Sequence, residues 1–134
     1  MGIEKTPRGF SMMRFVDAEG RPCSIQDSSL AEEACLWLGR DGADHQVRMH
    51  LTQDMAERLV ERLLHDACPD LDFLDRYGSR CVVRPSTDGK STLEAGIVMD
   101  FEGRGQEPML LSTAETTLLV PMLSTFVEKG SIAG

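Results

Sequence analysis

The sequence predicts an α+β protein of two pseudo-repeated units, each with a β-hairpin, two further strands and one helix, packed as one domain. The segments 15–29 and 73–87 share five residues at an offset of 58 positions. These are the Phe, Asp, Gly and Cys that begin with Phe15 and Phe73, and the Ser at positions 28 and 86. Farther along, a Met-x-Leu strand pattern and the helix after it recur at an offset of 60 positions. Strand alternation and helix phase recur together, which predicts an internal repeat. Neither unit has enough core to be stable alone.

The composition fits one globular domain. At 134 residues, with 41% apolar and 5% aromatic residues, aliphatic side chains and the eight Met must fill much of the core. The net charge of −8 argues against a protein that coats a nucleic-acid polymer, because phosphate contacts need clustered Lys and Arg. No apolar run approaches the ~20 residues of a membrane span, and Met1–Ser11 does not look like a signal peptide. We therefore expect a cytoplasmic protein without membrane contact.

The first unit is expected at residues 13–68, after a leading arm at 1–12. Arg14–Asp17 is a predicted strand, and Ala18–Arg21 is a turn in which Gly20 can adopt positive φ. Cys23–Gln26 returns antiparallel to the first strand, which predicts a hairpin.

The next segment is predicted to leave the sheet briefly. Asp27-Ser28-Ser29 should break the strand, because these side chains compete for backbone hydrogen bonds. Leu30–Ala34 could then form a single helical turn. Cys35–Leu38 is an apolar run closed by Gly39, as expected for a buried strand, and a polar loop follows at 40–45.

A strand and a helix complete this unit. Val47–Leu51 alternates with period two, which places Arg48 and His50 on the face opposite the apolar residues. Thr52 is the predicted cap of a helix that runs to about Asp66. Apolar residues recur on one face of this helix at Met55, Leu59, Val60, Leu63 and Leu64. Cys68-Pro69 should end it.

The second, divergent unit is expected at residues 69–134. Its predicted strands are 72–75, 80–84, 93–101 and 108–111, with a turn at 76–79, a polar loop at 85–91 and a turn at 103–106. Ser112 and Glu115 form a capping box at the start of the last helix. Gly130 ends that helix after Lys129, and Pro121 predicts a kink within it.

Residues 14–66 also carry an ordered pattern. It reads Phe15-x-Asp17-x-x-Gly20-x-x-Cys23-Ser24-Ile25-Gln26-x-Ser28-Ser29, then Leu36-Trp37-Leu38-Gly39 and Arg48-Met49-His50-Leu51. This stretch resembles a group of small phage and prophage proteins. The second unit departs from it, with Ile97 and Leu110 at the positions of Trp37 and His50. The resemblance implies a phage-encoded accessory protein and does not imply a reaction.

No motif predicts catalysis, a cofactor or a metal. The four Cys form no C-x-x-C pair, so buried structural thiols are the favoured interpretation over zinc or redox chemistry. No pattern ties Cys23 to any of the three His as a nucleophile and base. His45 and His50 would project to opposite faces of a strand. Neither the P-loop nor the dinucleotide-binding glycine pattern is present.

One group of polar and aromatic residues could bind a small ligand. Amide and hydroxyl groups suit a base edge or sugar, an indole can stack on a base, and a guanidinium pairs with phosphate. The candidate ligand-binding residues are Ser24, Gln26, Ser28, Ser29, Trp37, Arg48 and His50. The alternative is that Ser and Gln satisfy strand ends and Trp37 belongs to the core.

The sequence thus favours a non-enzymatic binding protein of phage type that counters a host defence. It would sequester a nucleotide-like signal, with Arg48 neutralising phosphate and Trp37 stacking, or it would block a host protein. The alternative is a structural or assembly accessory protein that acts only through protein contacts, including its own oligomer. A third hypothesis, a cysteine-dependent enzyme, requires a reactive thiol at Cys23.

Overall fold

The computed structural model describes residues 2–30, 33–41, 47–64, 71–76, 78, 80–85, 97–101 and 109–133. These residues form an α+β fold, as predicted, with two antiparallel sheets and two helices. The first sheet contains β1 (Glu4–Lys5), β2 (Ser11–Val16), β3 (Pro22–Leu30), β4 (Glu33–Arg40) and β5 (Val47–Thr52), and α1 (Gln53–Leu64) follows it. The second contains β6 (Leu71–Leu74), β7 (Arg80–Pro85), β8 (Ile97–Phe101) and β9 (Met109–Leu111), and α2 (Thr113–Lys129) follows it.

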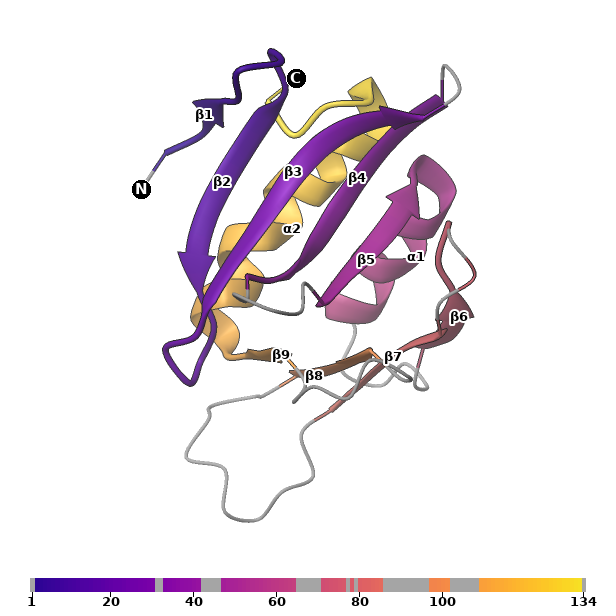
Figure 1. Ribbon diagram of the computed structural model, residues 1–134. Helices are drawn as coiled ribbons and strands as arrows, with labels where there is room; N and C mark the ends of the chain where they lie inside the picture. Colours follow the sequence, from indigo (N-terminus) through magenta and orange to yellow (C-terminus); the bar gives the residue numbers. More distant parts are fainter. Residues whose placement is uncertain are drawn as a thin grey trace.

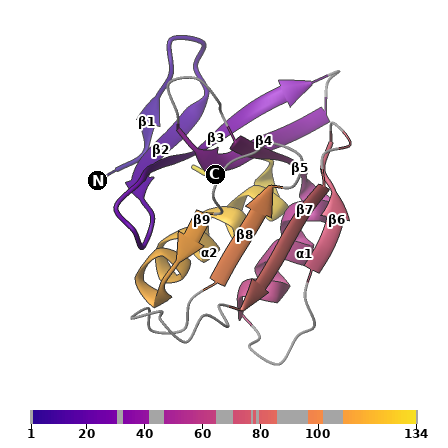
Figure 2. The same ribbon diagram turned by 60° about the horizontal axis from the view of Figure 1, so that its bottom comes forward.

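Both helices pack against one face of each sheet. Figure 1 shows the five-stranded sheet lying across α1 and α2, and Figure 2 shows the four-stranded sheet over the same helix pair. Strands follow one another in sequence order within each sheet. Both sheets and both helices contribute fully buried side chains to one apolar cluster, among them Ile25, Leu38, Met49, Leu59, Val83, Met109, Leu123 and Phe126. In the part of the chain described, neither helix could cross a membrane.

The strand β3 is longer than the sequence predicts. The expected break at Asp27–Ser29 and the helical turn at Leu30–Ala34 are wrong, because β3 pairs with β4 through Leu30 opposite Glu33. The carboxylate of Asp27 instead accepts hydrogen bonds from the backbone N–H of Ile132 at 2.9 Å and the hydroxyl of Ser131 at 2.6 Å. A distant segment therefore satisfies this side chain, and the β3 backbone stays in the sheet.

Part of the expected leading arm also joins the first sheet. Glu4 pairs with Met12 and Lys5 with Ser11, so β1 extends the sheet beyond β2. The backbone N–H of Phe10 donates to the hydroxyl of Thr6 at 3.0 Å, which closes the connecting turn. A two-residue strand carries too little pattern to be predicted from sequence.

The helix α1 begins where predicted and packs most of the predicted face against the core, with Met55 and Val60 half-buried there. The backbone N–H of Met55 donates to Thr52 Oγ1 at 3.4 Å, as expected for the cap. Leu59 and Leu63 are buried, whereas Leu64, which was expected on the same face, is 58% exposed. Residues 65–70, including the predicted helix end at Cys68-Pro69, lie outside the described residues.

The predicted ends of α2 are confirmed. Ser112 and Glu115 form the reciprocal capping box, and Gly130 follows the helix with φ of 76°. The helix continues through Pro121, and the kink there stays a prediction. The Gln53 side-chain amide, at the start of α1, donates to the carbonyl oxygens of Phe126 (3.3 Å) and Val127 (3.1 Å). This contact joins the first turn of α1 to the last turn of α2.

Each sheet is also tied to a hairpin turn of the other. The backbone N–H of Ala18, in the β2–β3 turn, donates to the carbonyl of Leu110 in β9 at 2.8 Å. The backbone N–H of Arg76, after β6, donates to the carbonyl of His50 in β5 at 2.8 Å. A buried carboxylate accompanies each contact: Asp17 accepts from the N–H of Leu110 at 3.4 Å, and Asp75 accepts from that of His50 at 3.1 Å.

The other predicted strands of the second half agree with β6, β7, β8 and β9 where the chain is described. The predicted turn that contains Gly78 is present, with φ of 80° at this glycine. The loop expected at 85–91 lies outside the described residues except for Pro85, which is the last residue of β7. The turn expected at 103–106 lies outside them altogether.

Candidate functional site

The outer face of the five-stranded sheet, turned away from the helices, collects most of the candidate ligand-binding residues. Gln26 is paired with Trp37, and Trp37 with His50, so these three side chains form one row across β3, β4 and β5. Ser24 and Arg48 flank Gly39 in the next row. The alternation predicted for β5 is confirmed, since Met49 and Leu51 are buried in the core while Arg48 and His50 lie on the other face.

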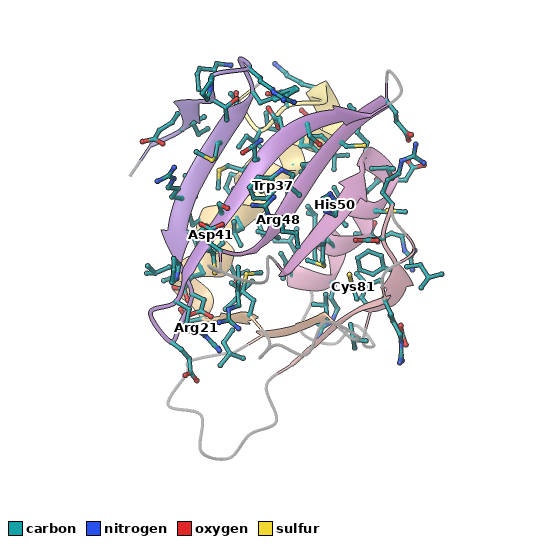
Figure 3. All side chains as sticks on the ribbon, viewed as in Figure 1. Arg21, Trp37, Asp41, Arg48, His50 and Cys81 are labelled. Atoms are coloured by element: carbon teal, nitrogen blue, oxygen red, sulfur yellow. The ribbon has the colours of Figure 1, made fainter. Side chains whose placement is uncertain are left out.

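Arg48 and Trp37 form the centre of this face. The Arg48 guanidinium carbon lies 3.7 Å from the centroid of the indole ring, well within the ~6 Å of a cation–π contact. Figure 3 shows both side chains near the middle of the sheet, on the side facing the viewer. Trp37 is 9% exposed, so the ring offers little free area for stacking. Burial lowers the pKa of Arg48, and the Asp41 carboxylate partly opposes that shift.

Small polar groups surround this pair. The Ser24 hydroxyl, which is almost fully buried, donates to Asp41 Oδ1 at 2.9 Å. Gln26 and Ser28 are half-buried, and Ser28 lies opposite Cys35 in a third row of the same face. Ser29 pairs with Ala34 in the backbone of β3, but its side chain lies outside the described part. Six of the seven candidate residues therefore share one face.

The cysteines are placed as structural thiols where they are described. Cys23, Cys35 and Cys81 are buried and form no disulfide, and Cys68 lies outside the described residues. Burial, with a smaller contribution from the Asp17 charge, raises the pKa of Cys23 to about 12. A thiol with this pKa is almost entirely protonated at neutral pH, which argues against its use as a nucleophile.

Two charged residues of this face were missed from the sequence. Asp41 was interpreted only as part of a turn, yet it accepts from Ser24 and lies near Arg48. The alternation of Cys35, Trp37 and Gly39 could have revealed this from the sequence, because it places position 41 on the same face. Arg14 is exposed in β2 opposite Ser24, and it shares that face.

The described residues contain no group of three or more His, Cys, Asp and Glu that could hold a metal ion. No protein-family model, curated protein or solved structure matches this chain.

Proposed function

We propose that this chain is a non-enzymatic binding protein whose recognition surface is the outer face of the five-stranded sheet. The ligand is a small, planar, anionic molecule of the nucleotide class. The observation that carries the proposal is the Arg48 guanidinium held 3.7 Å above the Trp37 ring. A guanidinium fixed in this way is orientated before the ligand arrives, so less conformational entropy is lost on binding.

The residues have distinct roles in this proposal. Arg48 pairs with phosphate and offers its planar outer side for stacking. Trp37 supports Arg48 from below rather than stacking on the ligand directly, because the ring is 9% exposed. Gln26, Ser28 and His50 are half-buried around this pair and provide hydrogen-bonding groups for a base edge or sugar.

The biological setting and the duplication belong to the same proposal. The phage-type pattern at 14–66 supports a phage accessory protein that works in the host cytoplasm and removes a host defence signal.

An internal duplication is supported by the reciprocal hydrogen bonds of the two hairpin turns with Leu110 and His50. In the second half, the positions of Trp37 and Arg48 hold Ile97 and Pro108, so the proposed site occurs once.

The first test is native mass spectrometry of protein purified gently from cells. We expect added mass of roughly a few hundred daltons, lost on denaturation. The chain has a single Trp, so fluorescence of Trp37 can then follow titrations with AMP, GMP and a cyclic dinucleotide.

The variant Arg48→Ala should weaken binding about tenfold or more, because the phosphate loses its charged partner. Arg48→Lys should fail to restore it, since an ammonium lacks the planar fork. Arg8→Ala is the matched control, because it removes one exposed Arg from the connection between β1 and β2, outside the rows that hold the candidate residues. Equal affinities of Arg48→Ala and Arg8→Ala would overturn the assignment. If the protein carries no added mass and its Trp37 fluorescence changes with none of the nucleotides, the alternative of a protein that acts only through protein contacts is favoured.

A further inference from the structure

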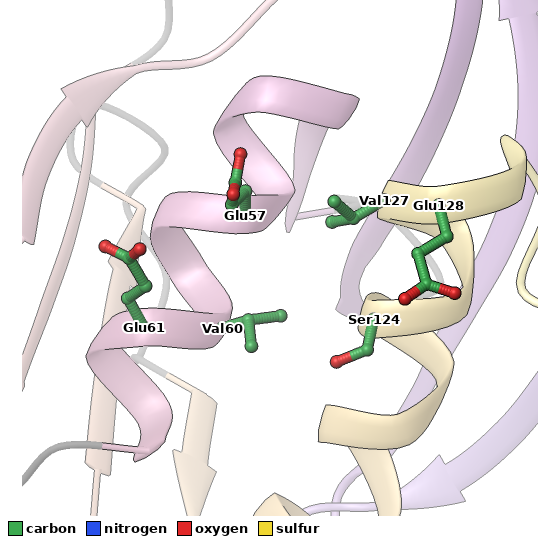
Figure 4. A pocket seen from close by; sticks show the side chains of 6 residues that line it. All are labelled: Glu57, Val60, Glu61, Ser124, Val127 and Glu128. Carbon is green, nitrogen blue, oxygen red and sulfur yellow. The ribbon is translucent and has the colours of Figure 1, made fainter.

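A groove runs between α1 and α2, away from the candidate ligand site. It has a volume of about 230 Å³ and is lined by Glu57, Val60, Glu61, Ser124, Val127 and Glu128. Figure 4 shows Val60 and Val127 projecting into the space between the helices, with Glu57 and Glu61 on the α1 side and Glu128 on the α2 side. The groove thus has an apolar floor between acidic walls.

Charge is segregated around this groove. All its charged lining residues are acidic, and Glu57 and Glu128 have no ion-pair partner among the described residues. The basic residues of the two helices lie elsewhere. Arg62 is 4% exposed, Arg58 lies 5.9 Å from the Phe73 ring, and Lys129 does not line the groove. Glu57 and Glu128 therefore present negative charge on both helices to an incoming partner.

The apolar floor extends toward the end of α1. Leu64 lies one helical turn after Val60, so it continues the same face of α1. Its side chain is 58% exposed, although sequence periodicity predicts a core position. At the other end, the Gln53 amide bonds to the last turn of α2 and holds the helices together. The helices are thus joined near Gln53, and the apolar face of α1 continues beyond the groove toward Leu64.

We propose that this groove is the docking site for a basic amphipathic helix of a partner protein. Apolar side chains of that helix would enter between Val60 and Val127 and cover Leu64. Lys or Arg on either side of its apolar stripe would pair with Glu57 and Glu128. Two adjacent helices with an apolar groove between them favour a third helix as occupant, by the ridges-into-grooves packing of helical recognition. The groove lies on the helix side of the five-stranded sheet, so this proposal is independent of the ligand site on the outer face.

The test uses a fluorescently labelled synthetic helix of about 18 residues, with Leu at positions i, i+3, i+4 and i+7 and Lys beside that stripe. Anisotropy should show saturable binding to the intact protein. A companion peptide with Glu in place of Lys should not bind. The double variant Glu57→Lys/Glu128→Lys should weaken the Lys peptide about tenfold or more and improve binding of the Glu peptide.

Matched variants separate docking from general attraction to an acidic protein. Glu4→Lys/Glu19→Lys makes the same change of net charge at exposed sites away from the groove, and it should leave affinity nearly unchanged. Leu64→Ala should weaken the peptide, whereas Leu118→Ala, which removes a 37% exposed Leu outside the groove lining, should not. Equal losses in the two charge variants, or no saturable binding, would overturn the proposal. So would a homodimer in sedimentation that only the groove variants dissociate, because the occupant would then be a second copy.

Discussion

The two hairpin turns that join the sheets share a backbone geometry but differ in their charged contacts. In both, a glycine at φ of 80° donates its N–H at 3.0 Å to the carbonyl of a buried Asp, Gly20 to Asp17 and Gly78 to Asp75. Each turn then reaches an edge strand of the opposite sheet.

The two turns differ in the ion pair that each one forms. Arg21 Nε lies 3.1 Å from the fully buried Asp17 carboxylate, within the same turn. The position four residues after Asp75 is Ser79, which carries no charge. The second turn instead forms an ion pair across to the first sheet, between Arg76 and Glu33 at 3.3 Å. The ion pair of the first turn is therefore local, whereas that of the second joins the turn to β4.

The largest effect is expected from removing the buried carboxylates. Asp17→Ala should lower the free energy of unfolding by about 3 kcal/mol, because it leaves Arg21 and the N–H groups of Glu19 and Leu110 without their acceptor. Asp75→Ala should cost about 2 kcal/mol, because the N–H of His50 loses its acceptor. Urea unfolding followed by circular dichroism measures both. A loss for Asp75→Ala that equals or exceeds that for Asp17→Ala would contradict the comparison.

An intermediate effect is expected at alkaline pH from Cys23, which follows the first turn. Its pKa is raised to about 12 in the folded state, so the folded protein holds the thiol proton more tightly than the unfolded chain. The resulting stability is fully present below the unfolded thiol pKa of about 8.5 and is lost as pH rises toward the folded value. Stability measured from neutral to alkaline pH should therefore fall less steeply for Cys23→Ala than for the wild type. Parallel curves would show that other groups cause the alkaline loss.

The smallest effect tests what the turns have in common. An added Cβ at Gly20 or Gly78 meets nothing within 4 Å, so only the left-handed backbone opposes it. Gly20→Ala and Gly78→Ala should each cost about 1 kcal/mol, and the two losses should be equal. Thermal unfolding of the pair checks this, and a clear inequality would mean that the turns do not share one backbone requirement.

Local pattern predicted the elements whose causes are local. The alternation of β5, the Thr52 cap, the capping box at Ser112 and the stop at Gly130 each depend on neighbouring residues, and each was predicted correctly. The break expected at Asp27 was wrong because its partners are more than a hundred positions away, at Ser131 and Ile132.

The candidate site shows the same division. Periodicity placed Arg48 and His50 on the face of β5 away from the core, as the structure has them. Periodicity could not show that Arg48 covers Trp37, because that contact joins two neighbouring strands, β5 and β4, and depends on their register. Leu64 matches the helical period of the core, yet its side chain is 58% exposed in the folded chain. Whether the side chain at such a position is buried depends on the tertiary arrangement, which periodicity does not give.

The contact of Asp27 with Ser131 and Ile132 also sets an order of events during synthesis. Asp27 is 6% exposed and belongs to the longest described strand, β3, which is made early. Its buried carboxylate finds these partners only after residues 131 and 132 have left the ribosome. Until then, the far end of the β3–β4 ladder holds a charge that favours water over the sheet. The first sheet can therefore begin to form from its hairpin early, but we expect its far end to become stable only when translation has passed the last helix.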